Sequence, residues 1–204
     1  MKLYFFPSPN PQKVHFAVNE LGLGCEIVPV DLTKGEHRSP AFLALNPCGR
    51  VPVLVDGDVA LSESHAILAY LGEKTGEMWP ATAAERAEAL KWMFFVAQHI
   101  APPTTEVVFN RIATKMLGIK GDEDAIIRGE KTLPRELQVL EDRLAKSRWV
   151  LGNAFTLVDC NYGPLLNALD KAGFRFGDYP RIQTYLDAIR DRPAWKETPR
   201  APGL

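Results

Sequence analysis

The 204-residue sequence contains few of the residues that build disulfide frameworks or metal sites. Its three cysteines, Cys25, Cys48 and Cys160, are an odd number at wide spacing, so we predict no disulfide framework. The four histidines form no His-x-x-x-His pattern and the sequence has no Cys-x-x-Cys pair, so we expect no bound metal.

An excess of one charge and long apolar runs are also absent. The formal net charge is −1, which gives no general attraction to nucleic acid or to an acidic membrane surface. The first apolar run is broken at Pro7, unlike that of a signal peptide, and the longest later run, residues 92–97, is far too short to cross a bilayer. We therefore predict a cytoplasmic protein without a nucleic-acid or membrane partner.

The first eighty residues alternate between strand and helix patterns. Apolar and aromatic enrichment predicts the strands, and apolar residues spaced three and four apart predict the helices. The predicted strands cover residues 2–5, 26–30, 51–55 and 59–61, and the predicted helices cover residues 11–21 and 62–73. This order predicts a small α/β domain on a mixed sheet over residues 1–77.

The remainder of the chain has only helical patterns. The predicted helices cover residues 83–100, 122–146, 156–171 and 181–190. We expect Pro102-Pro103 to break or bend the helical path, because proline in a helix interior lacks the N–H that the helix needs. The sequence thus predicts a second, all-α domain over residues 84–204.

The first loop, "PSPNPQKV" at residues 7–14, is unusually rich in proline. Asn10-Pro11 is a typical helix start, which places Ser8 just before a helix N-terminus. A hydroxyl there can donate a hydrogen bond to a thiolate, and so lower the pKa of the parent thiol. The residues by themselves favour a loop in which Ser8 and Asn10 only complete a turn.

Two further segments suggest peptide recognition. In "NPCGRVPV", residues 46–53, a cis Val51–Pro52 bond would turn the Val51 backbone groups outward to pair with another peptide, although trans is the commoner form. In "LSESHAI", residues 61–67, Ser62 is a natural N-cap, and Glu63 and Ser64 would then grip the ammonium and carboxylate of an amino acid. An ordinary capped helix explains the second segment as well.

Together, these segments resemble the cytosolic glutathione transferases in order and spacing, and more narrowly their bacterial members of the serine type. The stretch "KGEHRSPAFLALNPCGRVPVLVDGDVALSESHAILAYL", residues 34–71, is similar to the glutathione-binding half of their N-terminal domain. The stretch "VLGNAFTLVDCNYGPLL", residues 150–166, resembles their capping box, in which Thr156 and Asp159 would cap a core helix. The resemblance implies a thioredoxin-like domain with a four-stranded mixed sheet, followed by an all-helical domain.

The resemblance also implies roles for single residues. Ser8 would bind the glutathione sulfur, Val51 before a cis Pro52 would pair with the cysteinyl unit, and Glu63 and Ser64 would hold the γ-glutamyl end. Basic residues near the glycine carboxylate would be His37, Arg38 and Arg50. Glutathione would be a co-substrate, and the protein would be a homodimer without a metal.

The class within the family depends on the first loop. A phi- or theta-like enzyme would use Ser8 to activate glutathione for attack on small hydrophobic electrophiles. A bacterial nu-like enzyme would reduce small disulfides with two glutathiones, and Asn10 would then be a second donor to sulfur rather than a helix cap. A glutathione-binding carrier or interaction module is the non-enzymatic alternative.

An electrophile pocket is expected between the two domains. Its expected lining is Phe6, Pro7, Phe95 and His99, although these side chains are also explained as core or dimer contacts.

Overall fold

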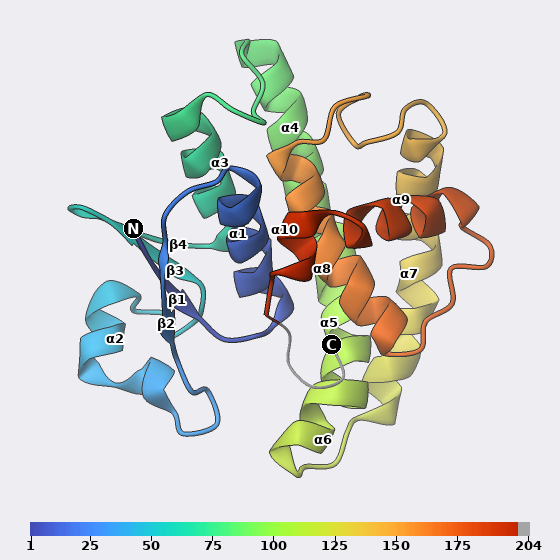
Figure 1. Cartoon of the computed structure of the whole chain (residues 1–204). Helices are drawn as coiled ribbons and strands as arrows, with labels where there is room; N and C mark the ends of the chain where they lie inside the picture. Colours follow the sequence, from blue (N-terminus) through green and yellow to red (C-terminus); the bar gives the residue numbers. More distant parts are fainter. Residues whose placement is uncertain (200–204) are drawn as a thin grey trace.

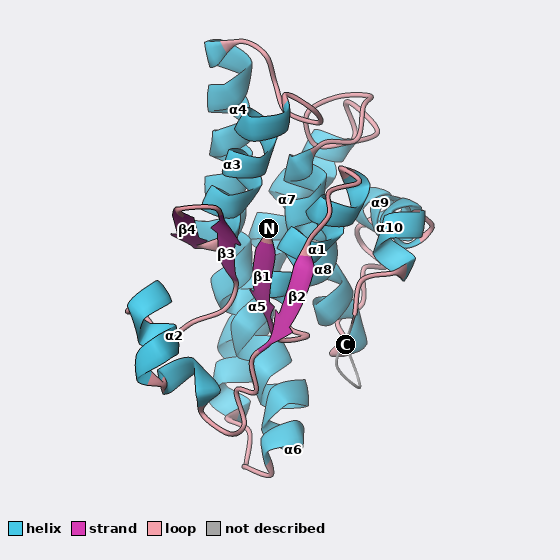
Figure 2. Ribbon diagram, turned by 60° about the vertical axis from the view of Figure 1, so that its left-hand side comes forward, coloured by secondary structure: helices cyan, strands magenta, loops and turns pink. Residues whose placement is uncertain are grey.

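The computed structural model describes residues 1–199, and a four-stranded sheet and a set of helices form one body (Figure 1). The strands are β1 (Lys2–Phe5), β2 (Glu26–Pro29), β3 (Val53–Asp56) and β4 (Val59–Ser62). Their order in the sheet is β2-β1-β3-β4, with β1 parallel to β2, and with β3 antiparallel to both β1 and β4 (Figure 2). The predicted mixed sheet is therefore confirmed.

The alternation of side chains along β1 explains how the sheet is covered on both faces. Leu3 and Phe5 are buried in the main core, which also contains residues of α1 (Pro9–Glu20) and α3 (Ser64–Thr75). Tyr4 points to the other face, where its ring lies edge-on at 5.9 Å from that of Phe42 in α2 (Pro40–Leu45). The sheet thus lies between α2 on one face and α1 with α3 on the other (Figure 1).

A long helical path follows the link at residues 76–82. It consists of α4 (Ala83–Phe95), a π-helical turn (Val96–Ile100), α5 (Ala101–Val108), a second π-helical turn (Phe109–Ala113) and α6 (Thr114–Leu117). The path does not break at Pro102-Pro103, although a break was one of the two outcomes that we expected. Both prolines lie in the first turn of α5, directly after the first π-helical turn, where the regular pattern of backbone hydrogen bonds is already altered.

The remaining helices complete the helical half. They are α7 (Glu123–Leu144), α8 (Leu157–Lys171), α9 (Pro180–Arg190) and α10 (Pro193–Lys196). The predicted helices in this region are confirmed to within two residues at each end. Helix α8 packs against α1, α3 and α5, and Figure 1 shows α1 and α8 side by side in the centre of the molecule.

The start of α8 has the predicted capping interaction. Asp159 Oδ2 accepts hydrogen bonds from the Thr156 backbone N–H at 2.8 Å and from the Thr156 hydroxyl at 3.0 Å. Its Oδ1 accepts from the Val150 N–H and from the Tyr185 hydroxyl, both at 3.0 Å. The buried carboxylate therefore joins the loop before α8 to α9, as well as capping the helix.

No helix in residues 1–199 is long and apolar enough to span a membrane. The domain limits 1–77 and 84–204 stay a prediction, and the last five residues of the second range lie outside the described residues.

Candidate active site

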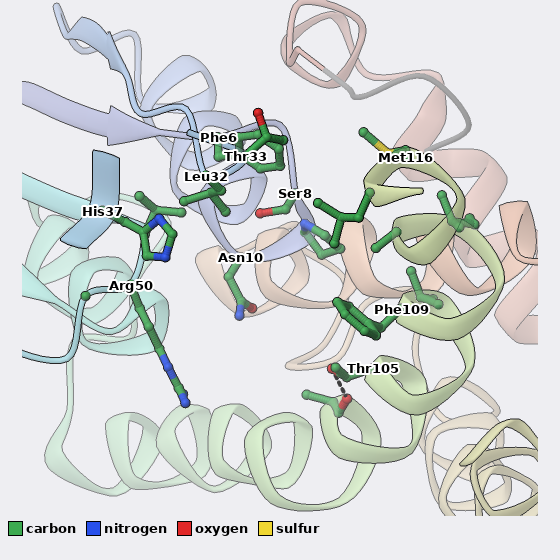
Figure 3. A pocket seen from close by; sticks show the side chains of 18 of the residues that line it. Phe6, Ser8, Asn10, Leu32, Thr33, His37, Arg50, Thr105, Phe109 and Met116 are labelled. Atoms are coloured by element: carbon green, nitrogen blue, oxygen red, sulfur yellow. Dashed lines mark hydrogen bonds between the residues drawn. The ribbon is translucent and has the colours of Figure 1, made fainter. Parts of the chain in front are cut away.

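A cavity of about 690 Å³ lies between the sheet half and the helical half (Figure 3). The sheet half contributes the loop after β1, the segment after β2 and the loop before β3, and the helical half contributes the path from α5 to α6. The lining residues are Phe6, Ser8, Pro9, Asn10, Leu32, Thr33, His37, Arg38, Leu43, Cys48, Gly49, Arg50, Val51, Ala101, Thr104, Thr105, Val108, Phe109, Ile112, Ala113, Met116, Leu117 and Leu165.

The two sides of this cavity differ in chemistry. The sheet side has three basic side chains, His37, Arg38 and Arg50, and no acidic residue lines the cavity in the described part of the chain. Arg38 and Arg50 are exposed and form no ion pair within residues 1–199. The helical side is mainly apolar, with Phe109 and Met116 at the surface. The cavity can therefore take an anionic ligand on one side and an apolar group on the other.

Ser8 lies where the two sides meet. It is the N-cap of α1, with φ −122° and ψ 163°, and its carbonyl oxygen accepts the first helical hydrogen bond from Gln12 N–H at 3.1 Å. Its hydroxyl makes no capping hydrogen bond. Figure 3 shows Ser8 and Asn10 between His37 on one side and Phe109 on the other. The hydroxyl is therefore free to contact a ligand at the positive end of α1.

Our expectation that Asn10 caps this helix was wrong, because α1 begins at Pro9 rather than at Pro11. Proline is tolerated throughout a first helical turn, where backbone N–H groups have no partner in the helix, so either proline could have started it. Asn10 is exposed and lines the cavity from the first turn of α1. Asn10 therefore lines the same cavity as Ser8.

The loop before β3 presents a backbone edge to the cavity. The Val51–Pro52 bond is cis, as expected, and Val51 lines the cavity while Pro52 is buried. Asn46 holds this loop: its Nδ2 donates to the Arg50 carbonyl oxygen at 2.7 Å, and its Oδ1 accepts from the Cys48 N–H at 3.1 Å. Because Asn46 is itself buried, the position of Val51 is well fixed.

The start of α3 differs from the prediction. Ser62 does not cap the helix, because it pairs with Val53 as the last residue of β4. The N-cap is Glu63, which has φ 67° and ψ 111°, a left-handed conformation that is rare for a residue with a side chain. Ser64 is buried in the first turn, and Glu63 is exposed. Neither lines the 690 Å³ cavity itself; both follow the strand next to β3.

The expected electrophile pocket was only partly right. Phe6 lines the cavity, but Pro7, Phe95 and His99 do not. The ring of Phe95 stacks on that of His99 at 5.2 Å, and His99 Nδ1 lies 3.8 Å from Glu136 Oε2 on α7. His99 lies within the π-helical turn at residues 96–100, and the lining residues of the helical path begin after this turn, at Ala101.

The apolar lining was missed by our sequence analysis. It lies on one stripe of the path from α5 to α6, with Ala101, Thr105, Phe109, Ala113 and Leu117 each four residues apart. This spacing is the ordinary signal of a helical face, and it was visible in the sequence. The bend expected at Pro102-Pro103 had left residues 101–121 without an assigned element.

The sheet and the helices that cover it have a thioredoxin-like arrangement, and they are joined to a helical half. The cavity lies between these two parts. No group of residues in the described part of the chain could hold a metal ion. The family models for the glutathione S-transferase N-terminal domain and C-terminal domain match residues 1–73 and 119–188.

Known proteins agree with this assignment. Glutathione S-transferase 3 of Zea mays is 39% identical over 97% of this chain and 92% of its own length. Disulfide-bond oxidoreductase YfcG of Escherichia coli is 33% identical over 94% of this chain and 91% of its own. A glutathione transferase structure from Burkholderia graminis, with two glutathione molecules bound per subunit, has a TM-score of 0.88 and 32% identity over 97% of this chain and 86% of that one.

The chain therefore belongs to the glutathione S-transferase family. Because its relatives come from plants and bacteria alike, they support membership in the family but not the expected bacterial source.

Proposed function

We propose that this protein is a glutathione transferase that conjugates the thiol of glutathione to small hydrophobic electrophiles. The observation behind the proposal is the position of Ser8. Its hydroxyl makes no capping hydrogen bond and lies at the N-terminus of α1, between the basic and the apolar sides of a single cavity. A thiol bound there can be ionised on one side and meet an apolar electrophile on the other.

The reaction follows from this placement. The Ser8 hydroxyl donates a hydrogen bond to the sulfur, and the positive end of α1 adds a favourable field. Both stabilise the thiolate and lower the pKa of the bound thiol, whose proton passes to solvent. The thiolate sulfur attacks the electrophilic carbon, a carbon–sulfur bond forms, and the leaving group departs with its bonding electron pair.

The remaining residues hold the tripeptide in register. His37, Arg38 and Arg50 suit the glycine carboxylate, because they are the basic side chains of the cavity. The backbone N–H and C=O of Val51 suit the cysteinyl unit. Glu63 and Ser64 suit the ammonium and carboxylate of the γ-glutamyl end, since unpaired N–H donors begin α3 there.

Reduction of small disulfides is a second candidate, favoured by Asn10. Its amide lines the same cavity as Ser8, and could steady the sulfur of a second glutathione. Two glutathione thiols would then reduce one disulfide to two thiols, with glutathione disulfide as the other product. The E. coli relative is named an oxidoreductase of this kind.

A paired assay tests these functions on the purified protein. Glutathione-dependent turnover is measured with an aryl halide and with a small hydroxyalkyl disulfide, for the wild type and for Ser8→Ala and Asn10→Ala. Conjugation that is lost in Ser8→Ala supports the transferase. Dominant disulfide reduction that needs Asn10 supports the reductase. Glutathione binding without either reaction contradicts both and supports the carrier alternative.

A cytoplasmic homodimer is part of the same proposal. Helix α4 exposes Phe94, at 61% of its surface, and Leu90, at 38%, an apolar pair that a second subunit could cover. Sedimentation of the wild type and of Phe94→Glu measures the assembly, and a monomeric wild type would contradict it.

A further inference from the structure

Lys13 is a fully buried lysine without a hydrogen-bond partner. It lies in α1, one turn after Pro9 and Asn10, which line the cavity. None of its surface is exposed, and its Nζ makes no hydrogen bond within the described residues. A buried ammonium without a partner is costly, and such a group is more often found at a functional site than in an ordinary core.

The charged groups near Lys13 belong to the start of α3, which packs against α1. The Glu63 carboxylate is its electrostatic partner, and His65 is close enough to sense the charge of Lys13. Burial, and then the positive charge of Lys13, lower the pKa of His65 to about 3, so His65 is neutral near pH 7. Glu63 is therefore the negative charge available to Lys13.

Charged groups elsewhere around α1 are already engaged. At the end of α1, Glu20 Oε1 accepts a hydrogen bond from Arg192 Nε at 2.5 Å.

The groups on α8 are engaged or neutral. The Asp159 carboxylate accepts hydrogen bonds at the helix start. Cys160 and Tyr162 are buried, which raises their pKa values well above the ordinary range, so both are neutral. His15 faces Glu197 near α10 and lies against Asn19. The inner face of β1 presents Leu3 and Phe5.

We propose that Lys13 is a positioning residue for glutathione: the charge of its buried ammonium attracts the Glu63 carboxylate across the packing of α1 on α3, so that affinity for the γ-glutamyl end follows the protonation of Lys13. The inference rests on the proposed function, because it takes the start of α3 as the γ-glutamyl site. It adds a residue that does not contact the ligand and acts through Glu63.

The conformation of Glu63 explains why such support is needed. With φ 67°, its backbone is held in a region that L-residues rarely adopt, and its side chain has no hydrogen bond that fixes it within the described residues. The positive charge of Lys13 attracts the carboxylate and restrains its position. Without that charge, the carboxylate is free to turn to solvent, and the ligand ammonium loses a placed partner.

The charge of Lys13 can change in a range that experiments reach. Burial lowers the pKa of Lys13 to about 7, while the Glu63 carboxylate acts in the opposite direction. Raising the pH from 6 to 9 therefore removes the ammonium in the free protein. If the ligand binds better when Lys13 is charged, affinity falls across this range, and binding takes up a proton.

The test measures the affinity of S-methylglutathione at pH 6 and at pH 9 by calorimetry. This ligand has the γ-glutamyl end but no thiol, so the thiol does not contribute to the pH dependence. The proteins are the wild type, Lys13→Arg, which stays charged at both pH values, and Lys13→Met, which has similar length and no charge. Titration of the ligand amine is common to all three proteins and cancels in the comparison.

Between pH 6 and pH 9, we expect the affinity of the wild type to fall about tenfold more than that of Lys13→Arg. A tenfold difference corresponds to a change of about one unit in the pKa of Lys13 when the ligand binds. Lys13→Met should bind about tenfold more weakly than the wild type at pH 6, and equally at pH 9. Thermal unfolding checks that each variant is folded; if Lys13→Arg is not, the Lys13→Met comparison decides.

Two different failures can be told apart. If the wild type binds no S-methylglutathione, the proposed function fails and the inference fails with it. If the wild type binds but Lys13→Met matches it at pH 6, or the wild type and Lys13→Arg have parallel pH profiles, the role of Lys13 is overturned while the proposed function stands.

Discussion

Thr104 and Thr105 are neighbours in α5 and both line the cavity, but their hydroxyls differ in their hydrogen bonding. The Thr105 hydroxyl donates to the Ala101 carbonyl oxygen, one turn earlier, at 2.8 Å (Figure 3). The Thr104 hydroxyl is buried and has no partner within residues 1–199, and only 1% of the residue is exposed. The Thr104 hydroxyl and the Nδ1 atom of His37 are thus two buried polar groups of the cavity wall that have no partner among the described residues.

Replacement of this hydroxyl should stabilise the protein. A buried polar group without a partner costs about 1–3 kcal/mol, so we expect Thr104→Val to raise the free energy of unfolding by about 1 kcal/mol. Thr105→Val is the matched control: it has the same change of shape and a similar helix propensity at an exposed site, and should change stability by less than about 0.5 kcal/mol. Urea unfolding measures both. A destabilised Thr104→Val would show that bound water satisfies the hydroxyl.

The pH profile of Ser8→Ala should reveal what the hydroxyl does. Loss of one hydrogen bond to a thiolate costs about 1.5–3 kcal/mol, so we expect kcat/KM for conjugation to fall roughly 10- to 100-fold at pH 6.5. The pKa of the bound thiol should rise toward its free value of about 8.5, so the loss should be smaller at pH 9.

Ser8→Thr is the control for this variant, because it keeps a hydroxyl at the same position and should keep most of the activity. A loss in Ser8→Ala that is equal at pH 6.5 and pH 9 would contradict thiolate stabilisation by Ser8.

Local rules predicted the elements of this fold well, but not their exact starts. Apolar and aromatic enrichment located the strands, and apolar residues three and four apart located most helices, because each signal comes from neighbouring residues. The start of α3 was misplaced because the pairing of Ser62 with Val53 competes with capping, and that pairing joins distant parts of the chain. The start of α1 was ambiguous between two prolines that the first turn accepts equally well.

Local motifs predicted part of the cavity lining. Ser8, Val51 and the basic residues line one cavity as expected. The apolar lining was not found, because the break or bend expected at Pro102-Pro103 left residues 101–121 without an assigned helix, although their spacing is that of a helical face. The buried position of Lys13 also escaped notice, since a lysine in an amphipathic pattern is ordinarily assigned to solvent.

Phe109 should contribute to binding of an aryl electrophile and not of glutathione. Its ring is 43% exposed at the apolar side of the cavity, away from the basic residues. Removing about half the contact of an aromatic side chain costs about 1–1.5 kcal/mol, so we expect Phe109→Ala to raise KM for an aryl halide roughly fivefold to tenfold. KM for glutathione should stay unchanged.

Phe95→Ala is the comparison for this prediction. Its ring packs on Trp92 and His99 outside the cavity, so its loss should lower stability and leave both KM values unchanged. If Phe95→Ala changed KM for the electrophile as much as Phe109→Ala does, the cavity described above would not be the electrophile site.

Lys13 should also make the stability of the ligand-free protein depend on pH. Burial lowers its pKa to about 7 in the folded protein, whereas the ordinary value in the unfolded chain is 10.5. Between these values the unfolded chain binds more protons, so the contribution of Lys13 to the free energy of unfolding rises with pH. From pH 6 to pH 9 this rise is on the order of 2 kcal/mol.

Lys13→Met removes this contribution, because methionine does not titrate. We therefore expect Lys13→Met to be more stable than the wild type at pH 6, since it buries no charge, and the difference to shrink as the pH approaches 9. Urea unfolding at both pH values measures the difference, in which all other titrating groups cancel. A difference that is the same at pH 6 and pH 9 would mean that Lys13 keeps its charge in the folded protein, most simply because the Glu63 carboxylate compensates for its burial.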